Sequence, residues 1–328
     1  MKNILKYSAL VFFGFLWFLG CSKTTTKFLY EKDILKDDYR YGDLYRLSNL
    51  PQFKDPRTEC PTKRIAQKVD ATLFLAGDSF TEEERINSGN FVSKEYVKAE
   101  VAKPNPPLKL APGKKILVIE TVERHLRERF TKVWQNWDIK EVIQEPDQKK
   151  FIEKLIDLKI PYVEESHQAA LFGFDFILKL KEWKALFNQK VLGKVDEKVT
   201  LSSDGKNILY FLDTNPGVSS NFDPIQDQEI ELMVENLNST YDYYHKLGFD
   251  EVYLSIIPNK TSKYGQGLGE YNHLIERIEK HPKLKMPVIS IFEEFQKGDY
   301  YLKGDSHWNC AGQQIWVDKI NEAVLKVK

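Results

Sequence analysis

The stretch Ala71-Thr-Leu-Phe-Leu-Ala76, followed by Gly77-Asp78-Ser79, indicates the fold of this chain. A short apolar run of this kind is typical of a strand that is buried on both faces. The glycine after it predicts a tight turn, because glycine accepts a sharp backbone path. Similar apolar runs recur further along the chain, at 115–120, 207–213, 251–257 and 287–291.

Segments with helical character separate several of these runs. We expect helices at about 122–130, 227–247 and 310–327, the second of them ended by Gly248. Strands that alternate with helices favour a parallel sheet covered on both faces. The sequence therefore predicts an α/β fold, a three-layer sandwich with a mostly parallel central sheet, in which ligands bind beyond the carboxyl ends of the strands.

The composition is that of a globular protein. The chain has 328 residues, of which 42% are hydrophobic and 13% aromatic, and these values exclude disordered and fibrous classes. Its 48 basic residues balance its 48 acidic ones. Nucleic-acid-binding proteins usually carry a basic excess or patch, so we expect no nucleic-acid partner.

The N-terminus has the features of a targeting segment. A short basic start precedes an apolar run from Ala9 to Leu19, which fits a secretory signal better than a membrane span. The sequence Phe18-Leu-Gly-Cys21-Ser resembles a bacterial lipobox, with Phe18 where that motif usually has leucine. The resemblance implies cleavage before Cys21, lipidation of Cys21, and anchoring to a membrane outside the cytoplasm, in the periplasm or at the outer membrane. An uncleaved anchor or a plain signal is the alternative.

We accordingly divide the chain into a lipoprotein-type signal peptide at 1–20, a tether and N-terminal arm at 21–70, and an α/β domain at 71–328. Residues 131–205 mix helical pieces (149–158 and 174–187) with lysine-rich segments, and we expect them to form an inserted cap. With Cys21 lipidated, Cys60 and Cys310 are the cysteines that remain available for pairing. An oxidising compartment permits a disulfide between them, but the sequence leaves the pairing open.

The first segment that carries chemistry is Gly77-Asp78-Ser79-Phe80. A serine at the tip of a buried strand is exposed at the functional edge of the sheet, where its own N–H can face a developing oxyanion. Position 81 is Thr, so this is not the Gly-x-Ser-x-Gly elbow of α/β-hydrolases. The alternative is that Ser79 caps a helix that begins at Thr81.

The second segment is Gly304-Asp-Ser-His-Trp-Asn-Cys-Ala-Gly312. Asp305 and His307 are two positions apart, so in an extended segment their side chains emerge on the same side. The carboxylate can then hold Nδ1 of the imidazole and leave Nε2 free as a base. Asn309 is placed to cap the following helix, although Asp305 is an alternative cap.

Together the two segments resemble the SGNH (GDSL-type) hydrolase superfamily. The string Asp305-Ser-His307-Trp308-Asn309 is most similar to the SGNH-like domains of alginate O-acetyltransferase proteins and their histidine-tryptophan-motif relatives. Residues 118–124 and 257–264 also match that subgroup. In the alginate proteins the Asp-x-His block precedes the serine block, whereas here Ser79 comes first. The resemblance implies an SGNH/flavodoxin-like fold in which Ser79 attacks an acyl ester, His307 transfers the proton and Asp305 orients His307.

Other residues are weaker candidates for oxyanion or substrate binding. They are Gly77, Arg124, Lys260, Trp308 and Asn309. Arg124 could instead pair with Glu120 or Glu123 on one helix face. Lys260 could be a solvent-facing lysine in a turn. The scattered histidines lack metal-ligand spacing, so we expect no metal site, and we expect no cofactor.

The leading hypothesis is an extracytoplasmic lipoprotein that adds O-acetyl groups to a surface or secreted polysaccharide, or removes them. Its partners would be a glycan or acylated sugar and, for transfer, an acyl-donor membrane protein. Transferase and esterase share an acyl-enzyme and differ in whether a sugar hydroxyl or water accepts the acyl group. The alternative is a non-catalytic lipoprotein that binds glycan or assembly partners on the same fold.

Overall fold

The computed structural model describes residues 2–32, 34, 42–55, 60–62, 65, 67–83, 85–105, 113–137, 166 and 174–327. The chain divides into two compact units. Residues 1–57 and 144–196 form the first, which we call the N-terminal unit. Residues 58–143 and 197–328 form the second, which we call the sheet unit.

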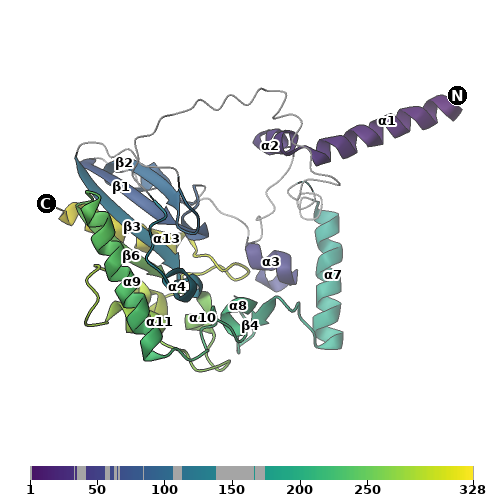
Figure 1. Ribbon diagram of the computed structural model, residues 1–328. Helices are drawn as coiled ribbons and strands as arrows, with labels where there is room; N and C mark the ends of the chain where they lie inside the picture. The colour runs from purple at the N-terminus through teal and green to yellow at the C-terminus, as the bar shows by residue number, and fades with distance from the viewer. Residues whose placement is uncertain are drawn as a thin grey trace. The chain divides into compact units, whose positions relative to one another are not determined.

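The sheet unit is built on a four-stranded sheet with the strand order β2-β1-β3-β6 (Figure 1). Its strands are β1 (Val69–Gly77), β2 (Ser93–Glu100), β3 (Lys114–Val122) and β6 (Glu251–Ile257). All three neighbouring pairs are parallel, so the carboxyl ends of the strands lie at one edge. Helices cover both faces, and the expected α/β sandwich with a parallel central sheet is confirmed.

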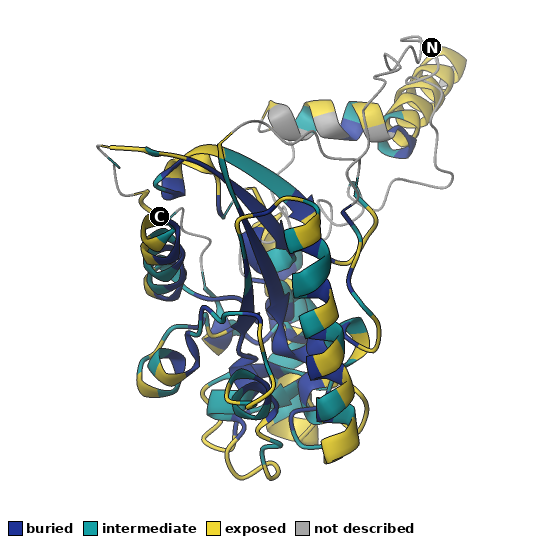
Figure 2. Ribbon diagram, turned by 60° about the vertical axis from the view of Figure 1, so that its left-hand side comes forward, coloured by how far each residue is buried: buried dark blue, intermediate teal, exposed yellow. Residues whose placement is uncertain are grey.

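The two faces follow from the alternation of side chains along each strand. On β1, Phe74 and Ala76 point into one apolar cluster, while Leu73 and Leu75 point into the other. Helices α4 (Glu123–Arg129), α9 (Asp227–Lys246) and α11 (Leu274–Glu279) cover the first face, and α12 (Phe292–Lys297) and α13 (Cys310–Lys326) the second. Figure 2 shows the inner strands β1 and β3 as mostly buried, whereas the edge strand β2 is largely exposed or intermediate.

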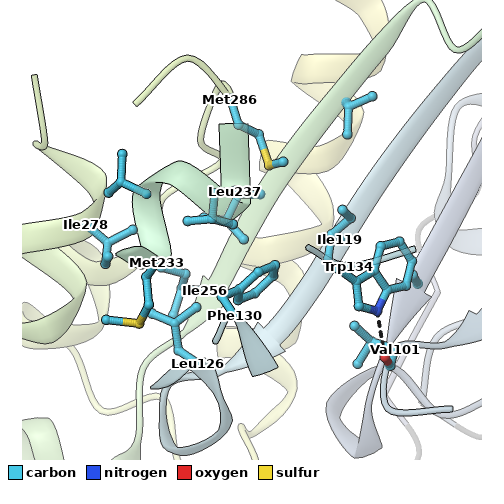
Figure 3. Close-up of a cluster of buried hydrophobic side chains, with 14 of the residues drawn as sticks. Val101, Ile119, Leu126, Phe130, Trp134, Met233, Leu237, Ile256, Ile278 and Met286 are labelled. Carbon is cyan, nitrogen blue, oxygen red and sulfur yellow. Dashed lines mark hydrogen bonds between the residues drawn. The ribbon is translucent and has the colours of Figure 1, made fainter. Parts of the chain in front are cut away.

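Figure 3 shows the core beneath α9. Met233 and Leu237 of α9 pack with Ile256 of β6 and Phe130, which follows α4. The indole N–H of Trp134 donates to the carbonyl oxygen of Val101, 2.8 Å away. The chain that leaves β2 is thereby tied to the chain that leaves α4.

Several sequence predictions differ from the structure. The run 207–213 does not join the parallel sheet: Ile208–Tyr210 (β5) pairs with Val199–Leu201 (β4) in a separate antiparallel sheet, and Phe211–Thr214 is helical (α8). The run 287–291 contributes a single parallel bridge, between Leu254 and Val288. Strand β2 was not predicted, because this edge strand carries the mixed sequence Ser-Lys-Glu-Tyr-Val-Lys-Ala-Glu.

The described residues of the N-terminal unit lie mostly in helices. These are α1 (Lys2–Cys21), α2 (Lys23–Glu31), α3 (Asp43–Ser48), the 3₁₀ turn η1 (Pro51–Phe53) and α7 (Asp175–Leu192). The segment Asn3–Cys21 is long and apolar enough to cross a membrane, a property that signal sequences share. Figure 2 shows most of α1 as exposed, up to its last residues, where Cys21 is buried. Helix α7 extends the helix expected at 174–187, and the helix expected at 149–158 lies outside the described residues.

Candidate active site

Ser79 follows directly from the carboxyl end of β1. Asp78 is extended and caps a single 3₁₀ turn, η2 (Ser79–Thr81). Its Oδ1 accepts from the Phe80 N–H at 3.3 Å, and its Oδ2 accepts from the Val122 N–H at 3.1 Å. The turn is thus fastened to the end of β3. The alternative in which Ser79 caps a helix from Thr81 is wrong, because Asp78 is the cap and the turn ends at Thr81.

Position 77 requires glycine because there is no room there for a side chain. A Cβ atom at this position would lie 2.1 Å from Thr81 Oγ1 and 2.7 Å from Glu120 Oε2. Thr81 Oγ1 donates a hydrogen bond to Glu120 Oε2, so a larger residue at position 77 would displace both side chains. The role of Gly77 is therefore to leave room for the side chains that hold the serine turn.

Asp305 and His307 reach the same edge of the sheet from the loop before α13. Asp305 Oδ1 lies 2.5 Å from His307 Nδ1 and also accepts from the His307 backbone N–H at 2.9 Å. His307 Nε2 lies 2.9 Å from Ser79 Oγ, although 228 residues separate the two. Asp305 and His307 are almost fully buried, and Ser79 is half-buried. The structure therefore brings together the nucleophile, base and orienting group that the sequence proposed.

Backbone pairing between Tyr301 and Trp308 closes the two ends of the loop. The Asn309 N–H donates to Tyr300 O at 2.8 Å, and the Leu302 N–H donates to His307 O at 3.2 Å. Between these pairs the chain bends at Ser306 and His307, and the His307 N–H folds back onto Asp305 Oδ1. The Asp305 and His307 side chains meet, as expected, but through this turn and not through the extended segment that the sequence analysis assumed.

The indole of Trp308 points the other way, into the core. Its ring lies 5.0 Å from Phe80 and 5.6 Å from Trp316, centroid to centroid, and only 2% of the residue is exposed. Phe80 also contacts the His307 ring, at 4.6 Å between centroids. Trp308 is thus a buried core residue. The prediction that it contacts substrate is wrong.

Asn309 caps α13, as expected. Its Oδ1 accepts from the Ala311 and Gly312 N–H groups, both at 3.0 Å, and its Nδ2 donates to Asp299 O at 2.9 Å. The amide oxygen and one of the two Nδ2 hydrogens are therefore engaged, and the role that the structure shows for Asn309 is to fix the start of α13. Cys310, the next residue, is disulfide-bonded to Cys60, with 5.2 Å between their Cα atoms. This bond settles the pairing that the sequence left open.

Lys260 is buried beneath the histidine loop. Its exposed fraction is 1%, so the alternative of a solvent-facing lysine is wrong. The Nζ donates to the carbonyl oxygens of Leu302 at 2.6 Å and Lys303 at 2.7 Å, and lies 3.5 Å from that of Asp305. Lys260 binds the loop that carries the candidate base and does not line a cleft.

Arg124 is held by an acid that the sequence analysis did not propose. Its guanidinium makes two hydrogen bonds to Asp213, Nε to Oδ1 at 2.8 Å and Nη2 to Oδ2 at 3.2 Å. The expected pairing of Arg124 with Glu120 or Glu123 is therefore wrong. Asp213 lies in α8, within the segment that was expected to be a strand. Burial raises the pKa of Asp213, and the positive charge of Arg124 opposes that shift.

A buried polar cluster under the serine turn was missed. Glu120 Oε2 accepts from the Asp78 N–H at 2.8 Å and from Thr81 Oγ1 at 2.9 Å, and Lys98 Nζ donates to Thr81 Oγ1. Burial, with the negative charge of Asp78, raises the pKa of Glu120 to about 8. The glutamate at the end of the apolar run 115–120 was the available signal, because an acid at the end of a buried strand needs partners.

Arg129 joins the same edge. It donates to Thr121 Oγ1 and lies 3.8 Å from Asp78 Oδ2. Burial lowers the pKa of Arg129 and also that of Lys98, while Asp78 and Glu120 oppose both shifts. Two acids and two cations therefore surround the serine turn, namely Asp78 after β1, Lys98 on β2, Glu120 on β3 and Arg129 on α4.

No protein-family model, no curated protein and no solved structure matches this chain.

Proposed function

We propose that this protein carries out acyl-ester chemistry with Ser79 as nucleophile, His307 as general base and Asp305 as the residue that orients His307. The observation that carries the proposal is the continuous chain of contacts, 2.9 Å from Ser79 Oγ to His307 Nε2 and 2.5 Å from His307 Nδ1 to Asp305 Oδ1. A serine hydroxyl is a weak nucleophile until a positioned base takes its proton, and this geometry supplies that base.

The reaction would proceed in two steps. Ser79 Oγ attacks the ester carbonyl carbon while its proton passes to His307 Nε2, and Asp305 stabilises the resulting imidazolium. The Ser79 N–H is the first of η2 and has no partner within the turn, so it can donate to the oxyanion. The alcohol leaves with the proton from His307. Water or a sugar hydroxyl then attacks the acyl-Ser79 ester and releases the acyl group.

We infer that the acyl group belongs to an extracytoplasmic glycan and that the protein is lipid-anchored through Cys21. The resemblance of residues 77–80 and 304–312 to the SGNH superfamily and its polysaccharide O-acetyltransferase branch supports the substrate class. The apolar segment Asn3–Cys21 supports export, and the Cys60–Cys310 disulfide fits an oxidising compartment. The acyl donor, for transfer, would be a membrane protein.

Labelling with a fluorophosphonate probe, together with hydrolysis of an aryl acetate, tests the chemistry. We expect the wild type to react and Ser79→Ala and His307→Ala to lose about 10³-fold or more of the rate. Ser88→Ala is the matched control, since Ser88 is an exposed serine in η3 (Ser88–Asn90) and should leave labelling intact. An inert wild type that nevertheless binds glycan would overturn the enzyme and favour the non-catalytic alternative.

A further inference from the structure

Helix α7 carries a continuous apolar stripe on its exposed side. The stripe consists of Phe176, Leu180, Trp183, Phe187 and Val191, whose exposed fractions are 69%, 44%, 65%, 57% and 64%. These residues follow one another at steps of four, three, four and four, so they fall within an arc of about 80° at 100° per residue. Isolated exposed apolar residues are ordinary, but a stripe of large ones along a whole helix marks an interaction surface.

The opposite side of α7 already has its partners within the N-terminal unit. Leu178 and Glu182 are buried there. Glu182 Oε1 accepts from the Tyr45 hydroxyl at 2.5 Å and pairs with Lys54. The helix is therefore held by one face, and the stripe is the face left exposed.

Lysines border the stripe on both sides. At 100° per residue, Lys179 and Lys190 lie along one margin and Lys184 along the other. All three are exposed. An apolar strip with tryptophan and phenylalanine between rows of lysine is typical of helices that lie in the membrane interface, where the apolar side chains enter the acyl boundary and the lysines contact anionic headgroups.

The position of α7 in the chain agrees with this occupant. The N-terminal unit also contains Asn3–Cys21, the segment long and apolar enough to cross a membrane. A chain tethered there, by the helix itself or by a lipid on Cys21, would keep α7 close to a bilayer. We propose that the stripe of α7 docks on the surface of an anionic phospholipid membrane, independently of the ester chemistry.

Contact quenching of Trp183 tests the proposal on the full chain. The protein is mixed with vesicles of phosphatidylcholine, with or without phosphatidylglycerol, in which some phosphatidylcholine carries bromine on its acyl chains. The signal is the quenching of the wild type minus that of Trp183→Phe. The subtraction removes the quenching that comes from Trp17 of the apolar segment and from the four buried tryptophans. Phenylalanine at position 183 keeps the stripe apolar.

We expect Trp183-dependent quenching in the anionic vesicles and its loss in Lys179→Glu/Lys184→Glu/Lys190→Glu. The control Lys94→Glu/Lys206→Glu/Lys297→Glu changes the net charge equally, at exposed lysines of the sheet unit, and should retain the quenching. Equal quenching in neutral and anionic vesicles would overturn the anionic-lipid assignment. Absence of Trp183-dependent quenching would overturn the docking. Emission of Trp183 that is already blue-shifted without lipid would then identify another segment of this chain as the cover, and a shift that depends on protein concentration would identify a second copy.

Discussion

Glu120 Oε2 accepts a 2.8 Å hydrogen bond from the backbone N–H of Asp78, the residue directly before the proposed nucleophile. The carboxyl group is buried at the end of β3, and its other oxygen makes no hydrogen bond with any described residue. Glu120 thus positions the Ser79 turn from below while it lies in surroundings that disfavour its charge.

The stability of the protein should fall as pH rises toward 9, and Glu120→Gln should reduce that fall. Burial and Asp78 raise the folded-state pKa of Glu120 from 4.5 to about 8, so the folded chain holds this proton more tightly than the unfolded chain. The resulting stability is complete below the unfolded pKa and is lost as pH rises through the folded one. Between pH 6 and 9 we expect wild type to lose about 2–3 kcal/mol more than the variant.

Denaturant unfolding of the two proteins at several pH values measures this difference. Other buried acids with raised pKa values, such as Glu123 and Glu279, titrate in both proteins and cancel. Removing Glu120 also removes a charge that raises the pKa of Lys98, which acts in the same direction. Parallel stability curves would show that Glu120 does not titrate in this range.

Lys260→Met should slow the proposed reaction mainly through kcat. The substitution leaves the carbonyl oxygens of Leu302 and Lys303 without the donor that holds them, which costs about 1–3 kcal/mol. The loop then holds His307 less firmly against Ser79, and we expect about a 10- to 100-fold loss in kcat with little change in KM. Lys303→Met removes an exposed lysine from the same loop and is the matched control. A larger change in KM than in kcat would contradict a positioning role.

Loss of the Cys60–Cys310 disulfide should lower the free energy of unfolding by about 2–5 kcal/mol, because a long loop is closed in the unfolded chain. The two cysteines are 250 residues apart, and Cys310 begins α13 directly after the histidine loop. Thermal unfolding with and without a reductant measures the effect, and Cys60→Ser/Cys310→Ser should unfold as the reduced wild type does. A midpoint that is insensitive to reductant would contradict the prediction.

Asp213→Asn should destabilise the protein by about 3–5 kcal/mol, because it leaves the Arg124 guanidinium buried without its carboxylate. The side chains of Arg124 and Asp213 are 8% and 0% exposed. The exposed pair of Lys206 with Asp204 provides the comparison, and Lys206→Met should change stability by less than about 1 kcal/mol. Denaturant unfolding distinguishes the two. An Asp213→Asn protein that is as stable as wild type would show that Arg124 does not depend on this pair.

The strands β1, β3 and β6 were predictable because each is an apolar run between turn signals. A short apolar run is the pattern that a strand buried on both faces leaves in the sequence. The run 207–213 looked alike but became β5 and α8, because periodicity cannot distinguish a short buried strand from a buried helical turn. Strand β2 was missed because it is an edge strand without an apolar run: Lys94, Glu95 and Glu100 are exposed.

The sequence by itself determined which residue types could perform ester chemistry, and it placed Asp305 and His307 two positions apart, close enough for their side chains to meet. Only the tertiary structure decided that His307 meets Ser79 across 228 residues, that Lys260 binds the loop from within, and that Arg124 pairs with Asp213. The physical reason is that a contact between residues two positions apart is local, whereas the partner of a buried charge is whichever group the packed sheet and helices bring beside it.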